Sequence, residues 1–205
     1  MKKLLSLQEL KIKKKDIVQI VEEINKNNYW GYEESWEYFI LGMSFLSPQS
    51  YGAKIQNRLV NQLMLEKVRP GENKGDFKDQ FGEYYEFKVS ILSNNDSKIN
   101  LVQIRPWQDI NHYCFVFDIR NEEFTPYAFR LSKSQMKEEL DIMKATAAHG
   151  TKDSNNNNKN IEYRMSISPN PENEHFKRWI EKYKTNFDFT KIANTEIKQK
   201  LKLVK

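Results

Sequence analysis

The hydrophobic period changes near residue 70, and this change limits the folds open to the chain. Before it, apolar residues recur at helical intervals, as Ile55, Leu59 and Leu63 do in "SPQSYGAKIQNRLVNQLMLEKV". After "RPGENKG" they recur at every second position, as in "YEFKVSI" from residue 85 to 91. Side chains repeat every 3.6 residues in a helix and every 2 residues in a strand. The sequence therefore predicts helices followed by a sheet.

Local start signals and further runs extend this pattern. Ser47 is suited to an N-cap and Pro48 to the first helical position, which predicts a helix start there. Strands are predicted at 76–80 with 83–92 as a hairpin, at 99–105, at 112–120 and at 161–167; helices are predicted from Ser132 or Ser134 to Gly150, and at 171–187. We expect an α/β fold: a central mixed β-sheet flanked by helices, with an N-terminal helical region at 1–46 and the main domain at 47–205, forming one compact unit.

Net charge, cysteine content and hydropathy limit the kinds of function that the chain can have. The 205 residues carry a formal net charge of +5, which is compatible with a polyanionic partner. The single cysteine, Cys114, lies in the apolar run "HYCFVFDI"; this excludes an internal disulfide, argues against a zinc site built from cysteines, and predicts a core position. "MKKLLSLQELKIKKKD" contains no apolar run long enough for a signal sequence or membrane span, so we expect a cytoplasmic protein without a membrane partner.

The candidate catalytic residues lie in the predicted hairpin. Glu86 and Lys88 share one face of their strand, where a core would be apolar. A solvated ion pair is the ordinary explanation for such a pattern. Asp76 joins the same face only if the turn has an odd number of residues, such as 81–83, with Gly82 at positive φ. In that register the competing Asp79 lies on the opposite side of the pleat. Two carboxylates on one face suit a hard divalent cation.

The stretch "GDFKDQFGEYYEFKVS" resembles the signature of the PD-(D/E)xK nuclease superfamily, and specifically its type II restriction endonucleases. The matched residues are Asp76, Glu86 and Lys88. The resemblance implies a restriction-endonuclease-like core, Mg²⁺ held by Asp76, Glu86 and the Phe87 carbonyl, and Lys88 serving the attacking water. It also implies a homodimer that cleaves double-stranded DNA to 5′-phosphate ends. The chain departs from the family pattern in lacking a proline before Asp76, and in carrying Gln56 where the preceding helix often has Glu.

Other polar residues are candidates for DNA binding. Gln103 and Arg105 alternate with Val102 and Ile104, so both are predicted to face the charged side of the sheet, where ordinary surface polarity is an equal explanation. Gln56 lies on an amide-rich helix face. In "AAHGTKDSNNNNKN" we expect residues 149–160 to be mobile in the free protein and to contact DNA; the candidates are His149, Thr151 and Lys152.

Two alternatives stay open at this point. One is a structure-selective repair or junction nuclease of the same superfamily, which needs mainly phosphate contacts rather than base contacts. The other is a non-catalytic DNA-binding module whose hairpin is a solvated wing. In that case Asp76 and Glu86 would face phosphates without a metal, which is electrostatically unfavourable.

Overall fold

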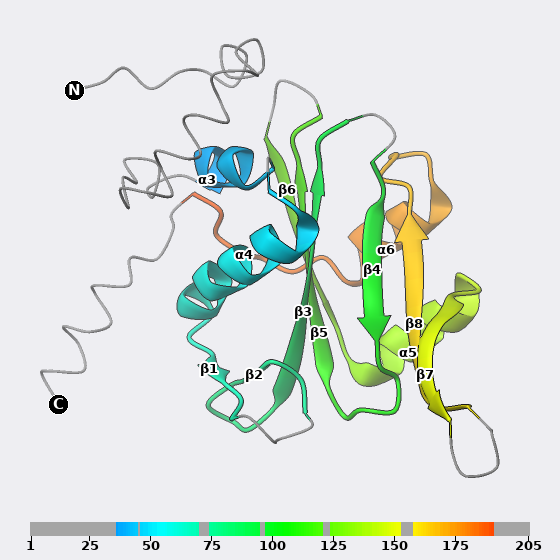
Figure 1. The fold of residues 1–205 in the computed structure, drawn as a ribbon. Helices are drawn as coiled ribbons and strands as arrows, with labels where there is room; N and C mark the ends of the chain where they lie inside the picture. Colours follow the sequence, from blue (N-terminus) through cyan, green and yellow to red (C-terminus); the bar gives the residue numbers. More distant parts are fainter. Residues whose placement is uncertain are drawn as a thin grey trace, which may run out of the picture.

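A computed structural model describes residues 36–44, 46–69, 74–94, 97–120, 124–152 and 158–190. The described part is mixed α/β (Figure 1). Its elements are α3 (Trp36–Met43), α4 (Pro48–Gln62), β1 (Glu66–Lys67), β2 (Phe77–Lys78), β3 (Tyr84–Leu92), β4 (Ile99–Ile104), β5 (Asn111–Asp118), β6 (Thr125–Leu131), α5 (Lys133–Ile142), β7 (Thr146–Lys152), β8 (Asn158–Ile167) and α6 (Glu174–Lys182). None of the helices described is long and apolar enough to cross a membrane.

The strands form two sheets. The larger has the order β1-β2-β3-β5-β6, with β3 and β5 parallel and the other pairs antiparallel, so the predicted mixed sheet is confirmed. The smaller has the order β4-β8-β7 and is antiparallel. The predicted strand at 99–105 therefore belongs to a separate sheet. Its partner β8 lies more than fifty residues further along the chain, and hydrophobic period carries no information about such a pairing.

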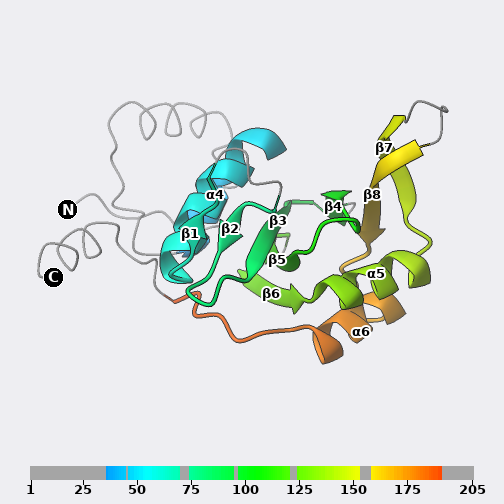
Figure 2. The same ribbon diagram turned by 90° about the horizontal axis from the view of Figure 1, so that it is seen from below.

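Helices α3 and α4 pack on one face of the five-stranded sheet (Figure 1), and Figure 2 shows α4 lying against it. The core between these helices and the sheet is rich in aromatic residues. In it, the Trp36 ring stacks on Phe117 with 5.5 Å between centroids. Most of the predicted N-terminal helical region, residues 1–35, lies outside the described residues. Its described part, α3, shares one hydrophobic core with α4 and β3.

The other face of this sheet packs on the second sheet and on α5 and α6. Cys114 is fully buried here, as predicted, and burial raises the pKa of its thiol to about 12. A thiol that stays protonated does not act as a nucleophile. The sheet thus has an aromatic core on its α3–α4 side and a second core under β4 and β8.

The helix starts predicted at Ser47 and Ser132 are confirmed, whereas α6 begins at Glu174 and ends at Lys182, inside the predicted 171–187. Ser47 caps α4, and Ser132 caps α5 in a capping box with Gln135. Helix α5 ends at Ile142 rather than at Gly150, because Lys144 takes a left-handed conformation with φ of 49°. The next residues form β7, paired with β8. Backbone pairing has overridden the helix propensity of the alanines in "KATAA".

Candidate functional site

The hairpin of β2 and β3 has the register that the predicted site requires. Phe77 pairs with Tyr85, and the amide of Asp76 donates to the carbonyl of Tyr85 at 2.9 Å, which places Asp76 level with Glu86. The turn has three residues, 80–82, between Asp79 and its partner at position 83, with Gly82 at φ of 84°. An odd-length turn with Gly82 at positive φ was predicted; its residues lie one position earlier than the example 81–83.

Gly75 fixes the backbone on which Asp76 stands. Its φ is +62°, a value that side chains other than glycine rarely adopt. A Cβ at this position would lie 2.8 Å from the carbonyl oxygen of Tyr85. Both constraints exclude a larger residue without a shift of the backbone. The glycine therefore allows the chain to pass close to β3 and to bring the Asp76 carboxylate beside it.

Glu86 and Lys88 are buried on one face of β3, as the strand period predicts. Glu86 is 5% exposed and Lys88 is 8% exposed. The Lys88 ammonium contacts Oε1 of Glu86 and donates to the backbone carbonyl of Gln103 at 3.0 Å. This is a buried ion pair rather than the solvated pair of the ordinary explanation. Its desolvation is unfavourable unless further hydrogen bonds compensate, and Gln103 supplies one such bond.

The second oxygen of Glu86, Oε2, is buried and has no hydrogen-bond partner among the described residues. Buried acceptors are rarely left in this state. The next carbonyl along the strand, that of Phe87, accepts a hydrogen bond of 3.2 Å from the side-chain amide of Gln56 on α4. A carbonyl oxygen has two lone pairs, so this bond leaves one for a second partner. Oε2 of Glu86 and the carbonyl oxygen of Phe87 can therefore each accept a further hydrogen bond.

A bulge in β4 brings Gln103 to the same place. The pairing of β4 with β8 shifts between Leu101 and Ile104, and Val102 and Gln103 are both exposed. The predicted alternation is therefore wrong at Val102, which is 51% exposed. Gln103 has φ of 54°, and bulges and strained residues of this kind occur frequently beside functional sites. Its carbonyl binds Lys88 while its side chain stays exposed.

Arg105 lies at the end of β4. It forms an ion pair with Glu162 of β8, with Nε 2.7 Å from Oε1. Burial alone would lower the pKa of the guanidinium, but this hydrogen bond and the negative charges of Glu86 and Asp76 outweigh burial and raise it. The negative charges of the two predicted metal ligands, Glu86 and Asp76, therefore act on Arg105.

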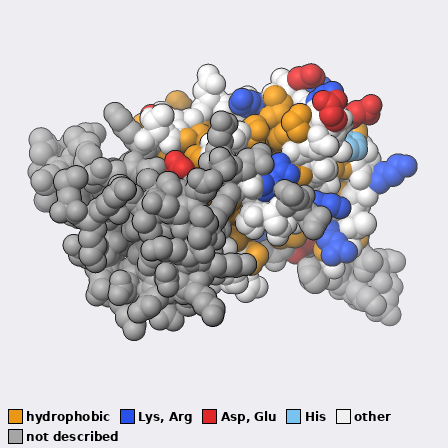
Figure 3. All heavy atoms as spheres, turned by 90° about the horizontal axis from the view of Figure 1, so that it is seen from above, with side chains coloured by type: hydrophobic (Ala, Val, Ile, Leu, Met, Phe, Trp, Pro, Cys, Tyr) orange, Lys and Arg blue, Asp and Glu red, His pale blue; other side chains and the backbone are white. Residues whose placement is uncertain are grey.

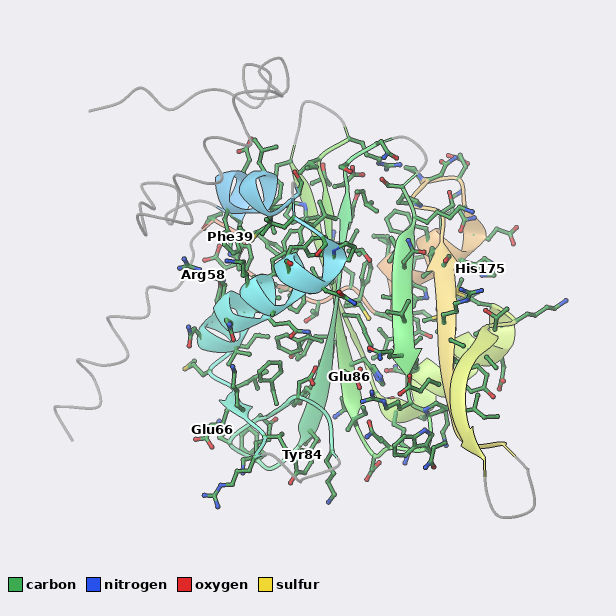
Figure 4. All side chains as sticks on the ribbon, in the orientation of Figure 1. Phe39, Arg58, Glu66, Tyr84, Glu86 and His175 are labelled. Atoms are coloured by element: carbon green, nitrogen blue, oxygen red, sulfur yellow. The ribbon has the colours of Figure 1, made fainter. Side chains whose placement is uncertain are left out.

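These side chains line one cleft, which has a volume of about 650 Å³ and lies between α4 and the two strands β3 and β4. In Figure 4 the labelled Glu86 lies at β3 on the side toward β4. The cleft contains every predicted residue of the hairpin site and three of the predicted DNA-binding residues: Asp76, Glu86, Phe87, Lys88, Gln56, Gln103 and Arg105. The face of the molecule seen in Figure 3 carries separate Lys and Arg side chains and a group of acidic side chains at one corner.

The donor set fits a hard cation in part. Asp76, Glu86 and the Phe87 carbonyl offer oxygen ligands on one cleft. Among the described residues, no group of three or more His, Cys, Asp or Glu side chains is placed to hold a metal ion. An ion in this cleft would therefore take two carboxylates and a carbonyl, and its other ligands would be phosphate and water oxygens.

Asp79 lies on the other side of the hairpin. Its Oδ1 accepts from the backbone amides of Phe81 and Glu83 at 2.9 and 3.0 Å, and its Oδ2 accepts from the hydroxyl of Tyr85. It lines a different pocket, together with Arg130. Asp79 is therefore a turn-forming residue, separated from Glu86 by the strand itself.

The remaining DNA-binding candidates lie elsewhere. The backbone of His149, Thr151 and Lys152 belongs to β7, and their side chains lie outside the described residues. β7 is two strands from β4, roughly 10 Å across the sheet. Residues 149–152 and 158–160 are paired in strands β7 and β8, where the sequence predicted no strand before Ile161; residues 153–157 lie outside the described residues, and the mobility of 149–160 in the free protein stays a prediction.

Sequence reasoning missed two residues that line the cleft, Ser90 and Asn100, and one buried residue beside it, His112. Ser90 and Asn100 join the two sheets, since the Ser90 hydroxyl donates to the Asn100 carbonyl and accepts from its amide. His112 is 2% exposed and pairs in register with Glu86 on the parallel strand β5. No signal in the sequence gives the register of a parallel pair that is joined by a long connection.

Comparison with models of known protein families gives no match for this chain, and comparison with curated proteins finds no relative.

Proposed function

We propose that this chain is a Mg²⁺-dependent DNA endonuclease that hydrolyses phosphodiester bonds in the cleft between α4 and β4. The observation that carries the proposal is the state of Glu86. This buried carboxylate contacts Lys88 through one oxygen and has no partner on the other among the residues that the structure describes, in a cleft that Asp76 also lines. A buried acceptor beside a second carboxylate is the environment that a divalent cation stabilises.

The ion would be held by Asp76, Glu86 and the Phe87 carbonyl. When bound, Mg²⁺ would supply positive charge for the phosphate and for the attacking water. The protein orients these oxygens beforehand. Gln56 binds the Phe87 carbonyl, and the close contact of Gly75 with β3 sets the position of Asp76. Oriented ligands avoid reorganisation during the reaction.

Lys88 would act on the water and on the phosphate. An ammonium group has three N–H donors, and contacts with Glu86 and the Gln103 carbonyl use two. The third is left for the attacking water or a phosphate oxygen. As the water oxygen attacks phosphorus in line, the bond to the 3′ oxygen breaks and a 5′-phosphate remains. A fixed positive charge at this point stabilises the negative charge that develops on the phosphate.

Double-stranded DNA is the proposed substrate, cut at specific sites as by a type II restriction enzyme. The exposed Gln103 amide and the Arg105 guanidinium lie on the cleft, and both groups suit hydrogen bonds to base edges or phosphates. The order α4, β2–β3 hairpin and parallel β5 supports a restriction-endonuclease-like core. A homodimer with its two-fold axis on a palindromic site completes the proposal.

Plasmid digestion with and without Mg²⁺ tests this function. We expect discrete fragments with Mg²⁺ and intact plasmid with EDTA, and we expect loss of cleavage in Glu86→Gln but not in Asp79→Asn. A smear would indicate a nuclease without sequence preference. Plasmid that stays intact under all conditions, but is still retarded on a gel by the protein, would indicate a non-catalytic DNA-binding module.

A further inference from the structure

A second buried polar group lies beside Glu86 and has no role in the proposed reaction. His112 is 2% exposed, and both nitrogens of its ring lack a hydrogen-bond partner in the described protein. Leaving a buried polar group without a partner costs about 1–3 kcal/mol. An imidazole in this state therefore calls for a physical explanation.

The register of the sheet places this residue beside Glu86. Glu86 and His112 are register partners on the parallel strands β3 and β5. Partners of this kind direct their side chains to the same face, about 4.8 Å apart. The Oε2 atom of Glu86 is an acceptor without a donor, and a neutral imidazole carries one N–H donor. The two unsatisfied groups are thus chemically complementary neighbours.

A histidine ring in its neutral form has one N–H donor and carries no charge. A neutral donor can bind a carboxylate without cancelling the negative charge that attracts a cation. Lys88, by contrast, brings a full positive charge to the other oxygen.

We propose that His112 is a positioning residue for Glu86, and that its ring N–H donates a hydrogen bond to Oε2. The bond forms through side-chain rotation alone, because the backbones are already adjacent in the sheet. Lys88 then holds one oxygen of the carboxylate and His112 the other, and the remaining lone pairs face the cleft. The consequence for cation binding rests on the proposed function; the hydrogen bond itself does not.

Nuclear magnetic resonance of protein labelled with ¹⁵N-histidine tests the hydrogen bond without metal or DNA. The chain has only 3 histidines, so the ring of His112 can be assigned by one substitution. We expect its N–H to exchange with water about 5- to 10-fold faster in Glu86→Ala, as loss of one hydrogen bond predicts. Asp76→Ala, which removes the other carboxylate of the cleft, should leave it unchanged. Equal exchange in wild type and Glu86→Ala would overturn the inference.

Binding of Mn²⁺ to the DNA-free protein tests the consequence, with the free ion followed by electron paramagnetic resonance. We expect His112→Phe to bind Mn²⁺ about 10- to 100-fold more weakly, the usual effect of losing a hydrogen bond to a metal ligand. His112→Asn keeps an N–H donor and should lose less. Cys114→Ala is the control, because Cys114 is buried on the same face of the sheet as the register partner of Lys88. This variant should bind Mn²⁺ as the wild type does.

The outcomes separate the two proposals. Wild-type affinity in a folded His112→Phe protein would overturn the positioning role. If His112→Phe does not fold, His112→Asn and the exchange measurement still decide it. If the wild-type protein binds no Mn²⁺ and cleaves no DNA, the proposed function fails, and the exchange measurement alone decides whether His112 binds Glu86.

Discussion

Two buried glutamates in this protein stand in opposite environments. Glu139 of α5 is fully buried, and its two oxygens accept four hydrogen bonds, two from Arg178 and one each from Trp179 and Tyr183. Glu86 is nearly as buried, but one of its oxygens has no partner in the described part of the chain. Since burial alone penalises both carboxylates, the protein compensates one of them completely and the other only in part.

The difference indicates a structural role for Glu139 and supports the proposed role of Glu86. The hydrogen bonds of Glu139 tie α5 to α6, and no lone pair is left for an external ligand. Glu86 lines the cleft with free acceptor capacity, beside Asp76 and Lys88. Satisfied buried charges hold a fold together, whereas an unsatisfied one beside a cleft supports the proposed site.

Replacing each of these glutamates by the isosteric glutamine should give the largest difference between the two residues in their effect on stability. In Glu139→Gln an NH₂ group replaces one acceptor and faces two donors, so we expect the free energy of unfolding to fall by about 3–5 kcal/mol. In Glu86→Gln the amide oxygen can still accept from Lys88, and the NH₂ group takes the place that has no donor. The Lys88 ammonium loses its counter-charge but keeps both acceptors, so we expect a loss of about 1–3 kcal/mol, smaller than in Glu139→Gln. Urea unfolding measures both, and equal losses would contradict the comparison.

Cleavage should show the reverse order. We expect Glu86→Gln and Lys88→Ala each to reduce DNA cleavage by at least about 100-fold while DNA binding persists, because acid–base and electrostatic contributions are each of that size. Glu139→Gln, assayed at a temperature where it is folded, should cleave as the wild type does. Plasmid cleavage with a parallel gel-shift assay measures both properties. Undiminished activity of Lys88→Ala would remove this residue from the site.

The pair of hairpin aspartates offers a second comparison. Asp76 lines the cleft, whereas Asp79 is bound within the turn. We expect Asp76→Asn to lower Mg²⁺-dependent cleavage by about 10- to 100-fold, since it removes one charge that would hold the ion. Asp79→Asn should leave cleavage unchanged. If only the Asp79 change abolished cleavage, the assignment of Asp76 would be wrong.

Local patterns were sufficient for the parts of the site that are close in sequence. Strand period placed Glu86 and Lys88 on one face, and the need for an odd-length turn with Gly82 led to the register of Asp76. The separate sheet of β4 and the position of His112 depend on pairings between distant segments. The bulge at Gln103 and the end of α5 depend on single left-handed residues within sequences of ordinary propensity. None of these features has a local signal.

The bulge allows base reading and catalysis to be tested separately. The Gln103 carbonyl binds Lys88, while the side chain is exposed on the cleft. Gln103→Gly keeps the carbonyl and suits the positive φ, so we expect cleavage to persist. Discrimination between cognate and altered sites should fall by about 10-fold, as for the loss of one base contact. Val102→Ala, at the adjacent exposed position, is the control. Unchanged discrimination in Gln103→Gly would move base reading elsewhere.

The smallest expected effect is the pH dependence of the Glu139 anchor. Burial alone would raise the pKa of this carboxyl, but the hydrogen bonds from Arg178, Trp179 and Tyr183 outweigh burial and lower it. A group whose pKa is depressed in the folded state binds protons more readily in the unfolded chain. Its stabilisation is therefore present above the unfolded pKa, near 4.3, and is lost as the pH falls toward the folded pKa.

The stability difference between wild type and Glu139→Gln should accordingly be constant from pH 7 to about 5 and narrow at lower pH. Urea titrations at a series of pH values measure this difference directly, and subtraction removes the carboxylates common to both proteins. Asp141→Asn, which removes an exposed carboxylate of the same helix, should give a difference that stays small throughout. A difference between wild type and Glu139→Gln that does not change with pH would mean that the shape of the side chain at this position, rather than its charge, anchors α5 to α6.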